Sequence, residues 1–94
     1  MKMTALRAEA RDRDCQMRWP GVCNHNRETV VLAHYRLSGI SGMGMKSPDE
    51  IAGWLCSDCH RLADTDKSPE VQLAFAHAVF RSQAQLLREG ALHV

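Results

Sequence analysis

The sequence has few aromatic residues and no long apolar run. Phe, Trp and Tyr make up 5% of the 94 residues, so few large side chains are available to fill the thin core of so short a domain. No stretch reaches the ~20 apolar residues of a membrane helix, and the residues from Met1 to Ala10 do not form the apolar segment of a signal peptide. We therefore expect a cytoplasmic protein that does not enter a membrane and that needs a staple in addition to hydrophobic burial.

A large charge of either sign is also missing, because the formal net charge is +1. This value alone indicates neither a nucleic acid nor an acidic partner. The charge is unevenly distributed, since residues 1–36 contain seven basic and four acidic side chains, a net charge of +3. That part of the chain can face phosphates, or it can form a solvated surface of mixed charge.

The staple that the sequence offers is a set of four cysteines: Cys15, Cys23, Cys56 and Cys59. In a reducing compartment thiols stay reduced, so metal ligands are favoured over two disulfides. Cys56 and Cys59 have the spacing that binds a tetrahedral zinc ion from a turn entering a helix. Cys15 and Cys23 are more widely spaced, but the turn-forming residues 19–21 (Trp-Pro-Gly) can bring their sulfurs together. We predict one structural Zn²⁺ held by four thiolates, which leaves no open position for catalysis.

Local patterns predict the elements that surround these cysteines. Good helix formers predict a helix over 3–14, and β-branched and apolar residues predict a strand over 29–37. The glycines and serines of 38–48 predict a loop. Ser57 is placed to cap a helix that runs to about Thr65.

A longer helix is predicted at the end of the chain. Ser68 provides a cap, Pro69 suits the first helical position, and Gly90 ends the segment. Its apolar residues recur at spacings of three and four, so one face is apolar: Val71, Phe75, Ala78, Val79, Ser82 and Leu86. Strand and helices together indicate one α+β domain over residues 1–94.

Two histidines are candidates for chemistry. His34 lies near the end of the predicted strand, where an imidazole can act as a general base toward water. His60 and Asp64 are four residues apart on one helix face and can both bind a divalent cation. Either feature alone is common on ordinary surfaces. Because the zinc would tie the Cys23 end of the strand to the start of the helix, we expect His34 to face His60.

These motifs resemble a known family of enzymes. A strand ending in His34, a glycine-bearing loop and the run Leu-Cys-Ser-Asp-Cys-His at 55–60 resemble the HNH, or His-Me finger, nucleases. More closely, the chain resembles the phage-encoded YbcO-like nucleases, through Cys15, residues 20–24, 32–34 and 48–49, residues 56–60, and Asp64. The resemblance covers about residues 10–65. It implies a zinc-stabilised ββα-metal core with an N-terminal helix and an accessory amphipathic helix at about 68–90.

The resemblance also implies roles for particular residues. His34 would be the general base of an endonuclease, and His60 would be a ligand of a catalytic Mg²⁺ or similar ion. The substrate would be nucleic acid, with DNA favoured and RNA left open, and the protein would be related to a phage or prophage. Arg18, Arg36 and Lys46 are candidates for binding its phosphates.

Two positions depart from the HNH pattern. Ala33 stands where many members have an acidic metal ligand, and Ile51 stands where the middle asparagine is usual. We expect Asp64 to be the second metal ligand. Asp49 is a weaker candidate, either for that ligand or for the group that orients His34.

Two other functions fit the same residues. A zinc-knuckle module that binds nucleic acid without cutting it would use the cysteines and arginines but neither His34 nor His60. A protein-interaction domain would use the apolar face of the last helix, and a homodimer through that face could accompany any of these functions. The remaining histidines, which have no partner at informative spacing, are expected to be structural or solvated: His25, His77 and His93.

Overall fold

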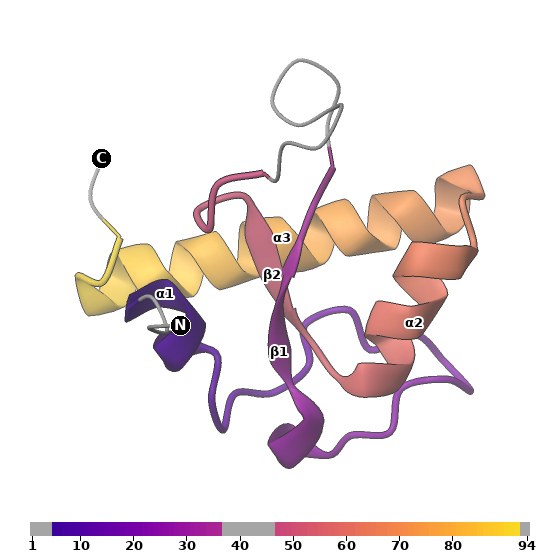
Figure 1. Ribbon diagram of the computed structural model, residues 1–94, viewed down its shortest axis with the longest axis horizontal. Helices are drawn as coiled ribbons and strands as arrows, with labels where there is room; N and C mark the ends of the chain where they lie inside the picture. Colours follow the sequence, from indigo (N-terminus) through magenta and orange to yellow (C-terminus); the bar gives the residue numbers. More distant parts are fainter. Residues whose placement is uncertain (1–4, 37–46, 93–94) are drawn as a thin grey trace.

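The computed structural model describes residues 5–36 and 47–92, in which two strands and three α-helices form a small α+β domain (Figure 1). The elements in chain order are α1 (Ala5–Glu9), the 3₁₀ turn η1 (Arg27–Thr29), β1 (Val31–His34), β2 (Ala52–Leu55), α2 (Ser57–Thr65) and α3 (Pro69–Glu89). β1 and β2 are antiparallel, with Val31 opposite Leu55 and His34 opposite Ala52. The predicted α+β class is confirmed.

The core lies between β2 and α3, which crosses behind the hairpin in Figure 1. The residues that α3 buries are the six predicted from its spacing: Val71, Phe75, Ala78, Val79, Ser82 and Leu86. Gly53 allows the close approach, because a Cβ at that position would lie 3.0 Å from the Val79 amide nitrogen. The Ser82 hydroxyl accepts a hydrogen bond from the Trp54 amide at 3.0 Å.

The limits of α3 agree with the local signals. Ser68 occupies the N-cap position, although its side chain makes no capping hydrogen bond, and Pro69 begins the helix. Gly90 ends it with a left-handed φ of 74°, a conformation that suits glycine. Because the apolar face of α3 fills the core, this helix is part of the domain's centre rather than an accessory to it.

The N-terminal helix is shorter than predicted. Within the described residues α1 ends at Glu9, whereas the prediction extended to Asp14. Asp12 has a φ of 58°, a left-handed conformation that an α-helix cannot contain. A turn toward Cys15 therefore ends the helix, although the helix propensity of residues 10–14 favours its continuation.

The strands also differ from the sequence prediction. The predicted strand began at Thr29, but η1 includes that residue, and Asn26 caps η1 by accepting a hydrogen bond from the Glu28 amide at 3.0 Å. Residues 49–55 showed no strand pattern of their own, yet Ala52–Leu55 form β2. All four residues of β2 are buried, so they lack the alternation of polar and apolar residues that marks a half-exposed strand.

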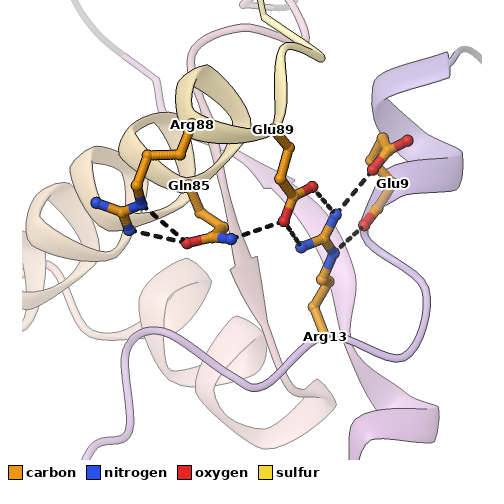
Figure 2. A network of polar contacts seen from close by, with 5 residues as sticks. All are labelled: Glu9, Arg13, Gln85, Arg88 and Glu89. Carbon is orange, nitrogen blue, oxygen red and sulfur yellow. Dashed lines mark hydrogen bonds and ion pairs between the residues drawn. The ribbon is translucent and has the colours of Figure 1, made fainter.

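A network around Arg13 joins both ends of the chain (Figure 2). Its guanidinium donates to the Glu9 carboxylate at 2.8 Å and to both carboxylate oxygens of Glu89, at 2.5 and 2.6 Å. Gln85 also donates to Glu89, at 2.7 Å, and accepts from Arg88 at 2.8 Å. The network therefore holds α1 against the last turns of α3.

No helix in the described part of the chain is both long and apolar enough to cross a membrane. Most of the predicted 38–48 loop lies outside the described residues.

Candidate functional site

The four cysteines form one cluster. Their sulfur atoms all lie within 4.8 Å of one another, and Sγ of Cys23 is 3.8 Å from Sγ of Cys56. The thiols are free, so the disulfide alternative is wrong. A tetrahedral zinc ion with Zn–S bonds of ~2.3 Å holds its sulfurs about 3.8 Å apart. The donor set therefore fits one such ion.

A tight turn brings Cys15 and Cys23 together in spite of their wide spacing. The Trp19 carbonyl accepts hydrogen bonds from the Val22 and Cys23 amides, at 3.1 and 2.9 Å, and Gly21 has a left-handed φ of 78°. The turn predicted at 19–21 is confirmed by this geometry. Because the turn reverses the chain, the two thiols meet on one side of it.

The second cysteine pair is fixed by the start of α2. Cys56 is the N-cap, and its sulfur accepts a hydrogen bond from the Cys59 amide at 3.4 Å. The prediction that Ser57 caps this helix is wrong by one residue. A thiolate takes the capping position because the free amides of a helix start stabilise negative charge.

Asn24 fastens the first cysteine turn to α2. Its side-chain amide donates to Ser57 Oγ and to Asp58 Oδ2, both at 3.1 Å. Its oxygen accepts from the Thr29 hydroxyl at 3.2 Å, and that hydroxyl in turn accepts from the Ser57 amide at 3.2 Å. The local sequence did not predict this role, because the partners of Asn24 on α2 lie more than 30 residues away.

The electrostatics of the cluster suit a bound cation. Burial, together with the neighbouring Cys15 sulfur, raises the pKa of Cys23 to about 11. Burial likewise raises the pKa of Cys59, against the effect of the Trp19 amide. Burial also opposes ionisation of Cys56, but hydrogen bonds from the amides of Cys59 and Asn24 and from the thiols of Cys59 and Cys23 together lower the pKa of Cys56. Since such crowded thiols resist losing their protons together, a divalent cation is the natural counter-charge.

His25 is the histidine that the structure relates to the cysteine cluster. Its Nδ1 lies 3.7 Å from Cys23 Sγ, although the ring is exposed. The residue has a left-handed φ of 55°, and its amide favours the thiolate of Cys23. The spacing of two residues gave no sequence signal for this contact.

His34 and Asp49 form a second site. His34 Nε2 lies 2.6 Å from Asp49 Oδ1, with 22% and 17% of the two side chains exposed. Arg7 of α1 approaches the same carboxylate oxygen, with its Nε at 3.8 Å. Three segments therefore meet there: the end of β1, the turn before β2, and α1. Of the two tasks considered for Asp49, this position suits the orienting of His34.

His60 and Asp64 lie one turn apart on α2, as predicted. His60 Nε2 is 3.6 Å from Asp64 Oδ2, and the side chains are more exposed, at 38% and 65%. An imidazole and a carboxylate at this distance can both bind one divalent cation.

The two histidine sites are held by different elements, His34 by the hairpin and His60 by α2. His34 is opposite Ala52, at the end of the hairpin that lies away from Cys56, so the cysteine cluster does not by itself bring His34 to His60. α2 turns back after β2 and runs beside the hairpin toward the His34 end (Figure 1). The separation between the His34–Asp49 site and the His60–Asp64 site therefore depends on the direction of α2.

Arginines line a groove of about 570 Å³ beside the cysteine cluster. Six of its lining residues are arginines and two are aspartates: Arg11, Arg13, Arg18, Arg27, Arg81 and Arg88, with Asp12 and Asp14. A smaller hollow of about 290 Å³ extends past Arg18 to Cys15 and His25. Of the predicted phosphate-binding residues, Arg18 lines the groove, Arg36 is exposed just after β1, and Lys46 lies outside the described residues.

Comparisons with known proteins agree over nearly the whole chain. A family model described as "Putative nuclease YbcO" matches residues 4–91, which include all of α3. The chain is 45% identical to "Putative nuclease YbcO" of Escherichia coli (strain K12) and to "Putative nuclease ybcO" of Enterobacteria phage 82, covering 96% of this chain and 98% of each relative. It is also similar to a solved structure described as a putative bacteriophage protein from Escherichia coli K-12. That likeness has a TM-score of 0.74 at 38% identity and covers 92% of this chain and 100% of the other.

Proposed function

Because this chain belongs to the YbcO family of putative nucleases, we propose that it is a metal-dependent endonuclease of the HNH type. In this proposal it is a phage- or prophage-related enzyme that hydrolyses phosphodiester bonds of nucleic acid, with DNA as the first substrate to test. The hydrogen bond between His34 and Asp49, at 2.6 Å, is the observation that carries the proposal. It provides the oriented general base that this chemistry requires.

The His34–Asp49 contact assigns the two ring nitrogens. A carboxylate only accepts hydrogen bonds, so the proton between the two groups belongs to Nε2. Nδ1 then carries the lone pair and can take a proton from the attacking water. In this role Asp49 is a positioning residue that orients His34. It replaces the middle asparagine of the HNH pattern, because Ile51 occupies that position in this chain.

His60 and Asp64 are the residues that we propose for the catalytic cation. A divalent ion bound there would relieve the charge that develops on the phosphate and its leaving oxygen. Asp64 would supply the acidic ligand that Ala33 cannot. The exposure of the pair leaves room for water and for substrate oxygens.

The arginine groove is the proposed seat of the nucleic-acid backbone. Its lining holds six arginines and two aspartates, and Glu9 and Glu89 bind Arg13 beside it, so the groove with these partners carries a net charge of +2. Phosphate contacts of this kind make binding independent of sequence and steeply dependent on salt. In this arrangement the cysteine-bound zinc is structural, because it sets the position of Cys15 beside Arg18 and of α2 with His60.

A non-catalytic zinc module that binds nucleic acid is the second candidate. The groove and the cysteine cluster favour it, since neither needs His34 or His60. The nuclease and the binding module would both bind nucleic acid, but only the nuclease would cleave it, so one cleavage assay separates them.

The test is to incubate supercoiled plasmid and Mg²⁺ or Mn²⁺ with the wild-type protein, with His34→Ala, and with His77→Ala as the matched control. His77 is exposed on α3 and belongs to neither histidine site. We expect nicking that requires the metal, a loss of about 10²- to 10⁴-fold in His34→Ala, and no loss in His77→Ala. Nicking that survives in His34→Ala would reject the proposed base, and a wild type that binds DNA without nicking it would favour the binding module.

A binding arm tests the groove separately. Arg11→Glu changes an exposed groove arginine, and Lys67→Glu makes the same change of charge between α2 and α3, outside the groove. We expect weaker DNA binding and a shallower salt dependence in Arg11→Glu alone, measured on a catalytically silent His34→Ala background. Equal effects of the two variants would remove the groove from the proposal and leave the nuclease assay untouched.

A further inference from the structure

The outer face of α3 is apolar where it meets solvent. Leu73, Phe80 and Leu87 expose 58%, 64% and 44% of their surface. They are seven residues apart, about two helical turns, so they lie along one line about 21 Å long. This outer stripe (Leu73, Phe80 and Leu87) lies opposite the core face of the helix. The dimer face expected from the sequence is that core face, which is buried within the chain, so the earlier expectation named the wrong side of α3.

The outer stripe is symmetric about Phe80. Leucines lie seven residues before and after Phe80, at 73 and 87, and alanines lie four residues before and after it, at 76 and 84. A surface that has the same residues in both directions from its centre can pack against an antiparallel copy of itself. Two-fold symmetric dimers are built from such self-complementary patches.

Two side chains of opposite charge lie beside the outer stripe, one near each end. At 100° per residue, Glu70 and Arg88 lie on the same side of the stripe, one near each end. In an antiparallel pair, Glu70 of each copy would face Arg88 of the other. In a parallel pair, the corresponding groups would be separated by about 27 Å along the axis. Among the described residues Glu70 has no ion pair, and Arg88 bonds only to the uncharged Gln85 (Figure 2).

We propose that a second copy of this chain covers the outer stripe, with the two α3 helices antiparallel and Phe80 packed on Phe80. Three exposed side chains per copy make a small interface, in the class below ~1,200 Å² that gives weak or transient association. We therefore expect a dimer that dissociates on dilution. The proposal does not depend on nuclease activity, because neither histidine site lies on the outer stripe.

The test is sedimentation velocity of the zinc-loaded protein over about 10 µM to 1 mM. The wild type should shift from monomer to dimer, whereas Phe80→Glu should remain a monomer throughout. Leu73→Glu is a second disruptive variant, and unchanged helix content by circular dichroism shows that each variant folds. A monomeric wild type at the highest concentration, or a dimer that survives both substitutions, would overturn the proposal.

A charge swap tests the antiparallel register. Glu70→Arg alone, and Arg88→Glu alone, should each weaken the dimer by placing like charges opposite each other. The double variant Glu70→Arg/Arg88→Glu should restore it. If the double variant remains as weak as the singles, the antiparallel register is wrong. Capture of a different protein by a monomeric wild type would count against a second copy as the occupant.

Discussion

A single hydrogen bond, between the His34 ring and the Asp49 carboxylate, engages Nε2 and leaves Nδ1 as the ring nitrogen that does not contact Asp49. At 2.6 Å the contact is short, and its residues are only about one-fifth exposed, so water competes with it weakly. Arg7 of α1 approaches the same carboxylate oxygen, with its Nε at 3.8 Å. The chemistry proposed for His34 thus depends on a residue 15 positions away in the sequence.

Asp49→Asn should lower kcat with little change in KM. An asparagine at 49 can donate as well as accept, so it can hold the wrong tautomer of His34, an effect that costs up to ~10⁴-fold in catalytic triads. Steady-state kinetics on plasmid DNA measure it, and Asp49→Glu should recover part of the rate. An altered KM with an unchanged kcat would show that Asp49 contacts substrate instead of positioning His34.

At the scale of elements, α1 is too short to be stable alone, since isolated helices shorter than ~12 residues are marginal in water. Its position depends on Arg13, whose guanidinium joins Glu9 to Glu89 (Figure 2). The same guanidinium lies over the Trp54 ring, 4.5 Å from its centre. Because α1 also carries Arg7, this link between distant helices supports the His34 site indirectly.

The Arg13–Glu89 ion pair makes the free energy of unfolding depend on pH. The hydrogen bond from Arg13 lowers the pKa of Glu89 from 4.5 to about 2, so folding favours the charged carboxylate. The stabilisation is complete above pH 4.5 and is lost as the pH falls toward 2. In urea unfolding, the free energy of unfolding of Glu89→Gln should lie below that of the wild type by a constant amount from pH 8 to 5. This difference should become smaller at pH 4. The control is Glu50→Gln, an exposed carboxylate that has no ion pair among the described residues. A gap that widens as the pH falls would contradict the assignment.

At the scale of the whole molecule, the cysteine cluster joins the segments that the small core cannot hold. Cys15 and Cys23 fix the first third of the chain, and Cys56 and Cys59 fix the junction of β2 and α2. Domains of this size are stabilised by about 5–15 kcal/mol in total, and structural zinc contributes a comparable amount in zinc-finger peptides. We therefore expect folding and metal binding to be one equilibrium.

Removal of zinc should unfold the protein. A chelator, or Cys59→Ser, should abolish the near-ultraviolet circular dichroism of the buried Trp54, with about one zinc released per chain. Zinc added back should restore the wild-type signal but not that of the variant. A Cys59→Ser protein that keeps a full equivalent of zinc would reject the four-thiolate site, and a chelated wild type that stays folded would reject the coupling.

The sequence by itself determined the features whose causes are local. The limits of α3 follow from Pro69 and Gly90, because their φ preferences act at the residue itself, whereas the Ser68 side chain makes no capping hydrogen bond. Its core face follows from apolar spacing. The pairing of Cys56 with Cys59, and the turn at 19–21, likewise depend on neighbours in the chain.

Only the tertiary structure decided which distant groups meet. β2 owes its conformation to burial against α3, since Gly53 admits that helix and its own sequence shows no strand pattern. The partner of Asp49 and the hydrogen bonds from Asn24 to α2 are set by contacts between segments far apart in the chain. Such contacts leave no periodic signal, because each depends on how whole elements pack and not on the residues beside it.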